Sequence, residues 1–436
     1  MHKFDAVIFG GGIAGLWTLA RLSGEGYRVL LLERSELGSG QTIASQGIIH
    51  GGIKYTLGLA EPGEASRAIA EMPEIWRACL EGRGEVDLRA ASVLSPHQSL
   101  WTTPGLLSRI AGLGASKVIR TEVKRLGRDE RPPIFNDAPR GIDVYQVDEP
   151  VLSIPSVVRA LAGPQIAAGR IARIDFPGRV RFERRPDEHG GAEKMIRCVL
   201  VGAGRAGEDV AIEARRWIFA AGEGNGALLD AAWADASMRA EGPLMQTRPL
   251  HMVMVRNPRL MGGEEPVIFG HCLGASNVPR LTINTDRLAL SGEWVWYVGG
   301  QIAETGVGRS AGEQIEEARR ELSVCLPWVD LAGASFATFR VNRAEGVSEG
   351  QAGGKVVRPD GPMVMEKNGV IVGWPTKLAF APLFASRVLE LMRRAEERPT
   401  GDGGTKIGER LVVPRYAVYP WEEPGQPGCV REGVWS

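Results

Sequence analysis

The sequence predicts a mixed α/β and α+β fold with two lobes, one built on a parallel sheet and one on a mostly antiparallel sheet. Its 436 residues exceed the size at which a single hydrophobic core stops growing. Residues 5–33 read as strand, glycine turn, helix and strand, a pattern typical of a parallel βαβ unit. Residues 248–257, 280–285 and 293–300 alternate between apolar and polar side chains, which predicts strands of a second sheet.

The glycines at the start of the chain predict a Rossmann-type nucleotide-binding turn. Gly10, Gly12 and Gly15 follow the spacing G-x-G-x-x-G between the first strand and the first helix. Gly10 suits a tight turn, Gly12 lets the backbone approach a pyrophosphate, and Gly15 lets the helix pack against the strand. The helix N-terminus would then bind the pyrophosphate through its free N–H groups.

Glu33 ends the second strand, where its carboxylate can accept hydrogen bonds from both ribose hydroxyls of a dinucleotide. The same carboxylate would repel a 2′-phosphate. We therefore interpret Arg34 as a solvated charge or a contact on the adenine side.

Later segments favour FAD over a nicotinamide cofactor, because a long flavin dinucleotide is often met by distant parts of a chain. Residues 170–176 and 195–202 read as strands, and residues 214–229 as a strand ending in a compact Ala-Ala-Gly turn. Residues 369–392 read as a strand, a Gly-Trp-Pro-Thr turn and a long helix starting near Lys377. A helix N-terminus there would stabilise the negative charge of a reduced flavin. A nicotinamide dehydrogenase remains the alternative, and it would be colourless.

The composition argues against several other classes. Lys plus Arg and Asp plus Glu number 52 each, and no basic stripe interleaved with aromatics suggests nucleic acid as a partner. The five cysteines form no CxxC pair, and the histidines form no HExxH motif or ligand triad, so no metal site is expected. The chain has no signal-peptide pattern and no apolar run of about 18 residues. We expect a cytoplasmic protein, with peripheral contact to the inner membrane left open.

The order of these motifs resembles the D-amino-acid-oxidase superfamily of FAD-dependent oxidoreductases. The residues that carry the resemblance are VIFGGGIAGL, LLLERSELGSGQTIASQGIIHGG, VDEPVLSIPSVVRAL, WIFAAGEGN and GVIVGWPTKL, which span residues 5 to 392 or so. Within the superfamily, SQGIIHGGIKY looks most like the glycerol-3-phosphate dehydrogenase and L-2-hydroxyglutarate oxidase branch. Gly51 stands where that branch has a serine, and residues 337–346 lack its proline.

The resemblance implies a Rossmann-type FAD-binding domain interleaved with a mostly antiparallel β-sheet substrate domain. The FAD-binding domain would comprise residues 1–60, 150–235 and 335–395, and the substrate or cap domain residues 61–149 and 236–334. Residues 396–436 would form a C-terminal extension, whose aromatic side chains suggest a strap across the lobes or a subunit contact.

The implied activity is removal of a hydride from a small anionic hydroxy substrate, a 2-hydroxy acid or polyol phosphate, to flavin N5. An amine or amino-acid oxidase or dehydrogenase on the same scaffold is the first alternative. A flavin-binding electron-transfer or interaction subunit without its own substrate is the second. Oxygen, a quinone or a carrier protein could each reoxidise the flavin. The oligomeric state is not specified by the sequence.

The candidate cofactor contacts come from the segments described above. They are Gly10, Gly12, Ile13, Ala14, Gly15, Glu33, Arg34, Ser45, Gln46, Gly47, Ile171, Ala221, Gly222, Gly373, Trp374, Thr376 and Lys377.

His50 is the candidate catalytic base, because the unperturbed pKa of imidazole lies closest to the working pH. A structural histidine and a covalent link to the flavin are the alternatives. Arg340 is the candidate clamp for the substrate anion, with Arg343 as its competitor, since a guanidinium binds a carboxylate through two hydrogen bonds. Either arginine could instead pair with Glu345. Lys54 and Tyr55 follow His50 and are candidates to line the substrate cavity or to lie at the surface.

Overall fold

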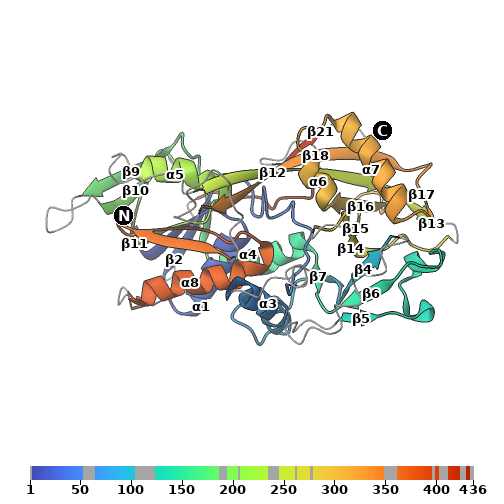
Figure 1. The fold of residues 1–436 in the computed structure, drawn as a ribbon. Helices are drawn as coiled ribbons and strands as arrows, with labels where there is room; N and C mark the ends of the chain where they lie inside the picture. The colour runs from blue at the N-terminus through green and yellow to red at the C-terminus, as the bar shows by residue number, and fades with distance from the viewer. Residues whose placement is uncertain are drawn as a thin grey trace.

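The computed structural model describes residues 2–52, 64–103, 123–185, 194–204, 207–233, 245–260, 263–274, 278–347, 361–394, 398–401, 411–422 and 429–432. These residues form two lobes that lie side by side, each centred on its own β-sheet (Figure 1). Among them, no helix is long and apolar enough to cross a membrane.

The first lobe contains an eight-stranded sheet in the order β19-β20-β11-β1-β2-β8, with β9 and β10 joined to the start of β11. Its strands are β1 (His2–Phe9), β2 (Val29–Glu33), β8 (Ile171–Arg173), β9 (Val180–Arg185), β10 (Lys194–Leu200), β11 (Val210–Phe219), β19 (Met363–Lys367) and β20 (Val370–Trp374). The five strands from β20 to β8 run parallel, which confirms the predicted parallel lobe. Every residue of β2 is buried, as expected for a strand covered on both faces.

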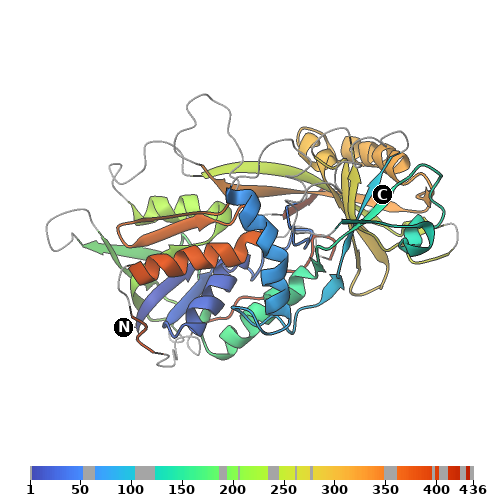
Figure 2. The ribbon, with the colours of Figure 1, turned by 60° about the horizontal axis from the view of Figure 1, so that its bottom comes forward.

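Helices cover both faces of this sheet. Side chains of α1 (Ile13–Gly24), α3 (Glu64–Leu80), α4 (Ile154–Ala167) and α8 (Ala381–Arg394) form the core on one face. Figure 2 shows α8 packed alongside α1. On the other face, α5 (Asn225–Ala232) packs with β9 and β10. Two short 3-10 helices, η4 (Gly222–Gly224) and η6 (Leu378–Phe380), precede α5 and α8.

The second lobe contains a nine-stranded sheet in the order β21-β18-β12-β16-β15-β14-β4-β6-β5. Its strands are β4 (Gln98–Thr102), β5 (Val123–Arg125), β6 (Val144–Val147), β12 (Met245–Arg256), β14 (Phe269–Leu273), β15 (Leu281–Arg287), β16 (Trp294–Gly299), β18 (Ser335–Gly346) and β21 (Cys429–Glu432). Neighbouring strands are antiparallel except β4 and β14, which confirms the mostly antiparallel lobe.

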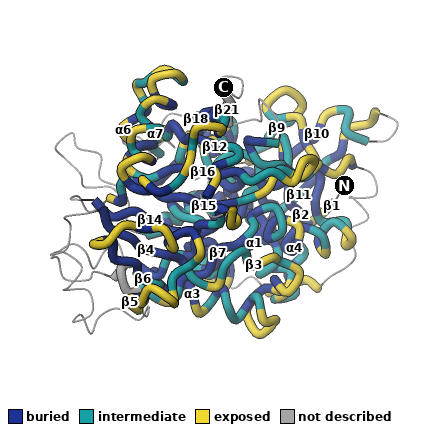
Figure 3. Tube along the Cα trace, turned by 90° about the vertical axis from the view of Figure 1, so that its right-hand side faces the viewer, coloured by how far each residue is buried: buried dark blue, intermediate teal, exposed yellow. Residues whose placement is uncertain are grey.

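The helices α6 (Gln301–Thr305) and α7 (Ala311–Cys325) pack over one face of this second sheet. The remaining short elements are β3 (Val93–Ser95) with β7 (Val151–Leu152), β13 (Arg259–Leu260) with β17 (Val329–Asp330), and the 3-10 turns η2 (Arg128–Glu130) and η3 (Pro133–Phe135). Figure 3 shows the strands buried beneath exposed peripheral turns.

Two boundaries between the lobes differ from those expected. Residues 335–346, expected in the FAD-binding domain, form β18, which pairs along its whole length with β12 of the second sheet. The helix α3, expected in the substrate domain, buries Ile69, Met72 and Trp76 in the core of the first lobe. The lobe that each element joins is decided by its packing and strand pairing. The order of the segments along the chain does not reveal it.

Within the C-terminal extension, the described residues 411–422 contact both lobes as a strap. Leu37 in the first lobe exchanges backbone hydrogen bonds with Arg415 and Ala417. The Trp421 ring lies 5.4 Å from that of Tyr297 in the second sheet, and it is 3% exposed. This arrangement agrees with the strap expected from the aromatic residues.

Candidate functional site

A cavity opens at the carboxyl ends of the parallel strands, where α1 begins. The cavity runs from the end of β2, past the glycine turn and the end of β11, to the turn after β20. Of the predicted cofactor contacts, it is lined by Gly10, Gly12, Ile13, Ala14, Glu33, Arg34, Ser45, Ala221, Gly222, Trp374 and Lys377. Open parallel sheets bind dinucleotides in this crevice.

The glycine turn is shaped for a close approach by a ligand. A Cβ at Gly10 would lie 2.6 Å from the carbonyl oxygen of Ala220, so no larger residue fits there. Gly12 caps α1 without a side-chain hydrogen bond, and both Gly12 and Ile13 line the cavity. The positive end of the helix dipole therefore faces a space suited to a pyrophosphate.

Glu33 lies at the other end of the turn, with its side chain largely buried beside the cavity. Its carboxylate accepts hydrogen bonds from the backbone N–H of Gly11 at 2.5 Å and of Ser35 at 2.7 Å. Burial raises the pKa of this carboxyl above its ordinary value, while the two N–H donors oppose that change. The position of this carboxylate at the cavity fits a ribose contact, and its negative charge would repel a 2′-phosphate.

Six predicted cofactor contacts do not line this cavity, and three of them, Gly15, Ile171 and Gly373, have structural positions next to it. Gly15 lies one turn into α1, where a Cβ would stand 1.9 Å from the carbonyl oxygen of Gly10; its role is to let helix and turn touch. Ile171 pairs with Leu31 inside the sheet and is fully buried, whereas Ile174, three residues later, lines the cavity. Gly373 accepts a hydrogen bond from Asn225 through its carbonyl oxygen.

A second cavity adjoins the first on the side of the nine-stranded sheet. Gln41, Ser45, Lys377 and Leu378 line both cavities, so the two meet there. The predicted contacts Gln46, Gly47 and Thr376 line this second cavity, together with His50. The helical run expected near Lys377 begins with η6 at Leu378, and α8 follows. The junction is therefore where a flavin ring bound in the first cavity would meet a substrate in the second.

The loop that carries His50 is held by a short antiparallel bridge to the segment before α4. Ile49 donates its N–H to the carbonyl of Pro150, and Leu152 donates to that of Gly47. Gly47 has a φ of 68°, and a Cβ there would lie 2.1 Å from the carbonyl oxygen of Leu152. This bridge brings residues 50 and 149 together, although they are far apart in the sequence.

Glu149 is a functional candidate that the sequence analysis missed. It is 0% exposed, and its Oε2 lies 3.3 Å from Nδ1 of His50. Its Oε1 accepts the N–H of Gly51 at 2.5 Å, and the side-chain amide of Gln98 donates to Oε2. Glu149 precedes Pro150, at the end of a short polar run, and nothing in that local pattern indicates a partner 99 residues away.

A second histidine supports the ring of His50. The His271 ring stacks on it with the centroids 5.5 Å apart and the planes inclined by 20°. Nδ1 of His271 lies 2.7 Å from the hydroxyl of Thr282, which also lines the second cavity. His271 thus packs against the ring of His50 from the nine-stranded sheet.

The two candidate arginines point to opposite sides of β18. Arg343 lines the second cavity, whereas Arg340 donates to the backbone carbonyls of Val307 at 2.5 Å and Arg309 at 2.6 Å. Residues an odd number of positions apart on a strand face opposite ways, so only one of the two can reach the cavity. The structure therefore corrects the expectation that Arg340 holds the substrate.

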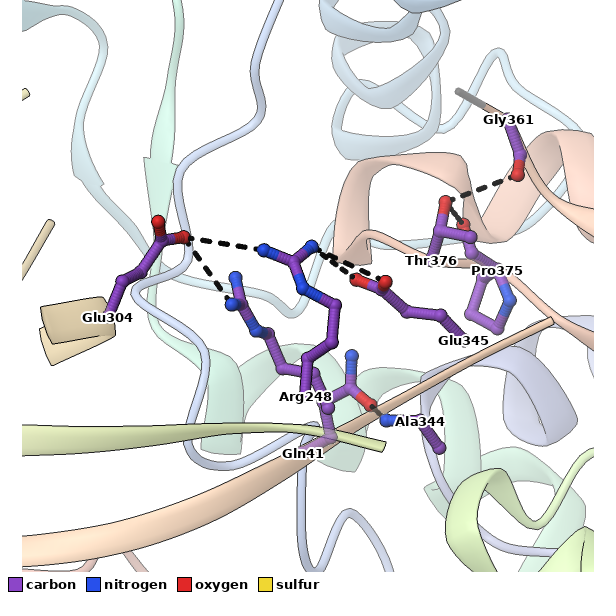
Figure 4. A network of polar contacts seen from close by, with 9 residues as sticks. Gln41, Arg248, Glu304, Ala344, Glu345, Gly361, Pro375 and Thr376 are labelled. Atoms are coloured by element: carbon purple, nitrogen blue, oxygen red, sulfur yellow. Dashed lines mark hydrogen bonds and ion pairs between the residues drawn. The ribbon is translucent and has the colours of Figure 1, made fainter. Parts of the chain in front are cut away.

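Arg343 belongs to a chain of alternating charges, of which Figure 4 labels Glu304, Arg248 and Glu345. Its guanidinium lies 3.4 Å from the carboxylate of Glu304, which lies 3.9 Å from Arg248. Arg248 in turn lies 3.4 Å from Glu345, which is fully buried. Glu345 thus pairs with Arg248, a partner that the sequence analysis did not consider. Both Arg343 and Glu304 line the cavity, so a bound molecule meets side chains of both charges there.

Two further predictions concern Lys54 and Tyr55 and the absence of a metal site. Lys54 and Tyr55 are outside the residues that the structure describes. Within the described ranges, no group of three or more histidine, cysteine, aspartate or glutamate side chains is arranged to hold a metal ion.

Comparison with known proteins gives matches over most of the chain. Residues 5–269 match the family model described as FAD dependent oxidoreductase. The chain is 42% identical over 424 residues to the probable FAD-dependent oxidoreductase PA4991 of Pseudomonas aeruginosa, with 96% of each sequence covered. The crystal structure of PA4991 superposes with a TM-score of 0.75 at 37% identity, covering 97% of this chain and 98% of that one.

More distant structures share the fold. Glycine oxidase from Geobacillus kaustophilus gives a TM-score of 0.56 at 16% identity, covering 92% of this chain and 99% of that one. L-alpha-glycerophosphate oxidase from Mycoplasma pneumoniae gives 0.55 at 14% identity, covering 90% and 95%. One of these proteins is named for an amino acid and the other for a glycerophosphate. At this level of identity the likeness shows the fold and does not identify the substrate.

Proposed function

Because this chain belongs to the FAD dependent oxidoreductase family, we propose that it removes a hydride from a carbon that bears a hydroxyl group in a small anionic substrate. A 2-hydroxy acid or a polyol phosphate fits this description. The observation that carries the proposal is that His50 lines the second cavity while the buried carboxylate of Glu149 lies behind its ring, beside Nδ1. Oxidation of an alcohol releases the hydroxyl proton. Because the hydroxyl group is a weak acid, a positioned base is needed to accept this proton.

The residues of the second cavity have separate roles in the proposed reaction. Arg343 binds the carboxylate or phosphate and fixes the orientation of the substrate. His50 accepts the hydroxyl proton as the carbonyl forms. Bound FAD supplies the two-electron acceptor for the hydride. Lys377, at the junction of the two cavities, would contact the ring end of FAD, and its positive charge would stabilise the reduced cofactor.

Oxidation of an amine is the second candidate, and Glu304 is the observation that favours it. Its carboxylate lines the same cavity as Arg343 and lies 3.4 Å from it. An amino acid carries an ammonium and a carboxylate, which would match that pair of opposite charges. The ammonium must first lose a proton. The lone pair of the neutral amine then assists hydride removal, so no base is needed at the moment the hydride leaves.

An anaerobic substrate screen separates the two candidates. The FAD-loaded protein is mixed with 2-hydroxy acids, polyol phosphates, amino acids and secondary amines, and bleaching of the flavin absorbance is recorded. We expect bleaching by at least one hydroxy compound. Bleaching by amines alone would transfer the proposal to the second candidate, and bleaching by neither class would remove both.

The variant His50→Ala tests the role of the base. We expect it to retain FAD, because His50 lies in the second cavity, and to reduce the flavin at least about 100-fold more slowly than the wild type. An unchanged rate would refute the assignment of His50 as the base.

A further inference from the structure

We propose that Glu149 is a positioning residue that fixes the tautomer and the orientation of His50. The inference rests on the proposed use of His50 as a base. It adds a residue that does not line the cavity and has no direct contact to make with substrate or cofactor.

The burial of Glu149 requires an explanation, because a carboxylate removed from water is stable only when it is paired and hydrogen-bonded. Three donors surround it: the ring nitrogen Nδ1 of His50, the backbone N–H of Gly51 and the side-chain amide of Gln98. Two of the three come from the loop that lines the substrate cavity. The carboxylate of Glu149 therefore holds both the backbone of this loop, at Gly51, and the ring of His50.

The contact at Nδ1 determines which ring nitrogen is basic. A carboxylate beside Nδ1 keeps that nitrogen protonated, so the basic lone pair of neutral His50 is on Nε2. The carboxylate also stabilises the imidazolium that forms when Nε2 takes a proton. The stacked ring of His271 restrains rotation of His50 at the same time.

The charged and titratable groups around His50 come from several elements. Glu149 and His271 contact its ring, and Arg343, Glu304 and Lys377 line the same cavity. Of these, Glu149 is the carboxylate within hydrogen-bonding distance of the ring in the part of the chain that the structure describes. Replacing it changes the charge beside Nδ1 and leaves the other four groups in place.

The first test reads the tautomer of the wild-type protein by 15N NMR of histidine-labelled enzyme, and it needs no turnover. The spectrum of His50→Asn identifies the signals of His50 among the six histidines. We expect neutral His50 to carry its proton on Nδ1. A proton on Nε2 would overturn the proposal, even if Glu149 variants fail to fold.

The second test compares Glu149→Gln with Asp148→Asn. The control removes the same charge from the adjacent residue, which pairs with Arg77 and His97 and is half-exposed. In Glu149→Gln the amide can donate to Nδ1 and favour the opposite tautomer. We expect the rate of flavin reduction to fall about 100-fold with little change in the substrate concentration at half-maximal rate. The acid limb of its pH profile moves to lower pH, because the imidazolium loses its neighbouring carboxylate.

Outcomes for the two proposals are distinct. If His50→Ala reduces flavin at the wild-type rate, the proposed function fails. If His50→Ala is slow but Glu149→Gln matches Asp148→Asn in rate and pH profile, the positioning role alone fails. Glu149→Asp, which keeps the charge, is expected to recover part of the rate lost in Glu149→Gln, and no recovery would assign the loss to packing.

Discussion

The proposal that the substrate is an anion rests on Arg343. Its guanidinium lines the second cavity, while Arg340 is directed at two backbone carbonyls on the opposite side of the strand. The pairing of Arg343 with Glu304 at 3.4 Å fixes the direction of the guanidinium. A substrate carboxylate or phosphate would therefore compete with Glu304 for the same fork of N–H donors.

We expect Arg343→Lys to raise the substrate concentration needed for half-maximal flavin reduction about tenfold or more, because an ammonium cannot form the paired hydrogen bonds of a guanidinium. Steady-state or stopped-flow reduction measures this directly. Arg340→Lys is the matched control, and it should leave that concentration unchanged although it loses hydrogen bonds to Val307 and Arg309. Equal effects of the two variants would contradict the assignment.

Glu33 makes the stability of the cofactor-free protein depend on pH. Burial raises its pKa above the ordinary value of 4.5, so the folded state retains a proton that the unfolded state has released. The free energy of unfolding must then fall as pH rises from 4.5 towards the raised value, and the extra stability is fully present only below 4.5.

Denaturation of the FAD-free protein at several pH values tests whether its free energy of unfolding falls or rises with pH. Relative to Glu33→Gln, the wild type should lose stability as pH rises through that window. Glu390→Gln, at an exposed carboxylate on α8, serves as the control and should follow the wild type. A wild type that gains stability relative to Glu33→Gln over the same range would show that the backbone donors outweigh burial.

At the scale of elements, the glycine turn shows what a local pattern can predict. Its spacing specified a strand, a turn and a helix, and β1, α1 and β2 occupy those positions. The same pattern predicted the turn that lines the first cavity, because the φ of 111° at Gly10 and the start of α1 at Gly12 belong to the turn itself. Glu33 followed for the same reason, since the end of β2 lies beside the turn. The atoms that a side chain at Gly10 would meet, in Ala220 and Ala221, are distant in the sequence.

Two identical substitutions in α1 test the role of close packing. Gly15→Ala should lower both stability and FAD content, because its Cβ would meet the carbonyl oxygen of Gly10 at 1.9 Å. Gly24→Ala, at the last residue of the same helix, meets nothing within 4 Å and should be neutral or stabilising by up to about 1 kcal/mol. Thermal unfolding and the flavin absorbance of the purified protein provide the readouts. Retention of full FAD content in Gly15→Ala would contradict the role given to this turn.

The contacts that the sequence did not predict depend on pairing between distant segments. Arg340 and Arg343 lie three residues apart, and which of them faces the cavity is decided by how β18 pairs with β12. Glu149 meets His50 through a bridge between the loop and residues 150–152. Ile171 and Ile174 both follow α4, and the point at which β8 ends decides which reaches the cofactor cavity. None of these follows from periodicity within one segment.

At the scale of the whole molecule, the site exists only where the lobes meet. The first lobe contributes the glycine turn and Lys377, and the second contributes Arg343 and Thr282. The strap of residues 411–422 contacts both, through Leu37 on one side and Tyr297 on the other. The side chain of Tyr419 adds a hydrogen bond from the N–H of Ile154 at the start of α4.

We expect Trp421→Ala to lower the free energy of unfolding by about 3 kcal/mol or more, because the buried indole packs against Tyr297 and Tyr419. Val412→Ala, at a position on the same strap that is 68% exposed, should change it by less than about 0.5 kcal/mol. Chemical denaturation of both variants decides the question. Similar values for the two would mean that the strap does not couple the lobes.

A crystal structure of the FAD-loaded protein soaked anaerobically with a hydroxy acid that bleaches it tests the arrangement most directly. We predict one extended dinucleotide from Glu33 past the N-terminus of α1 to Lys377, with the substrate anion on Arg343 and its hydroxyl at His50. A flavin ring elsewhere, or a substrate bound away from Arg343 and His50, would contradict it.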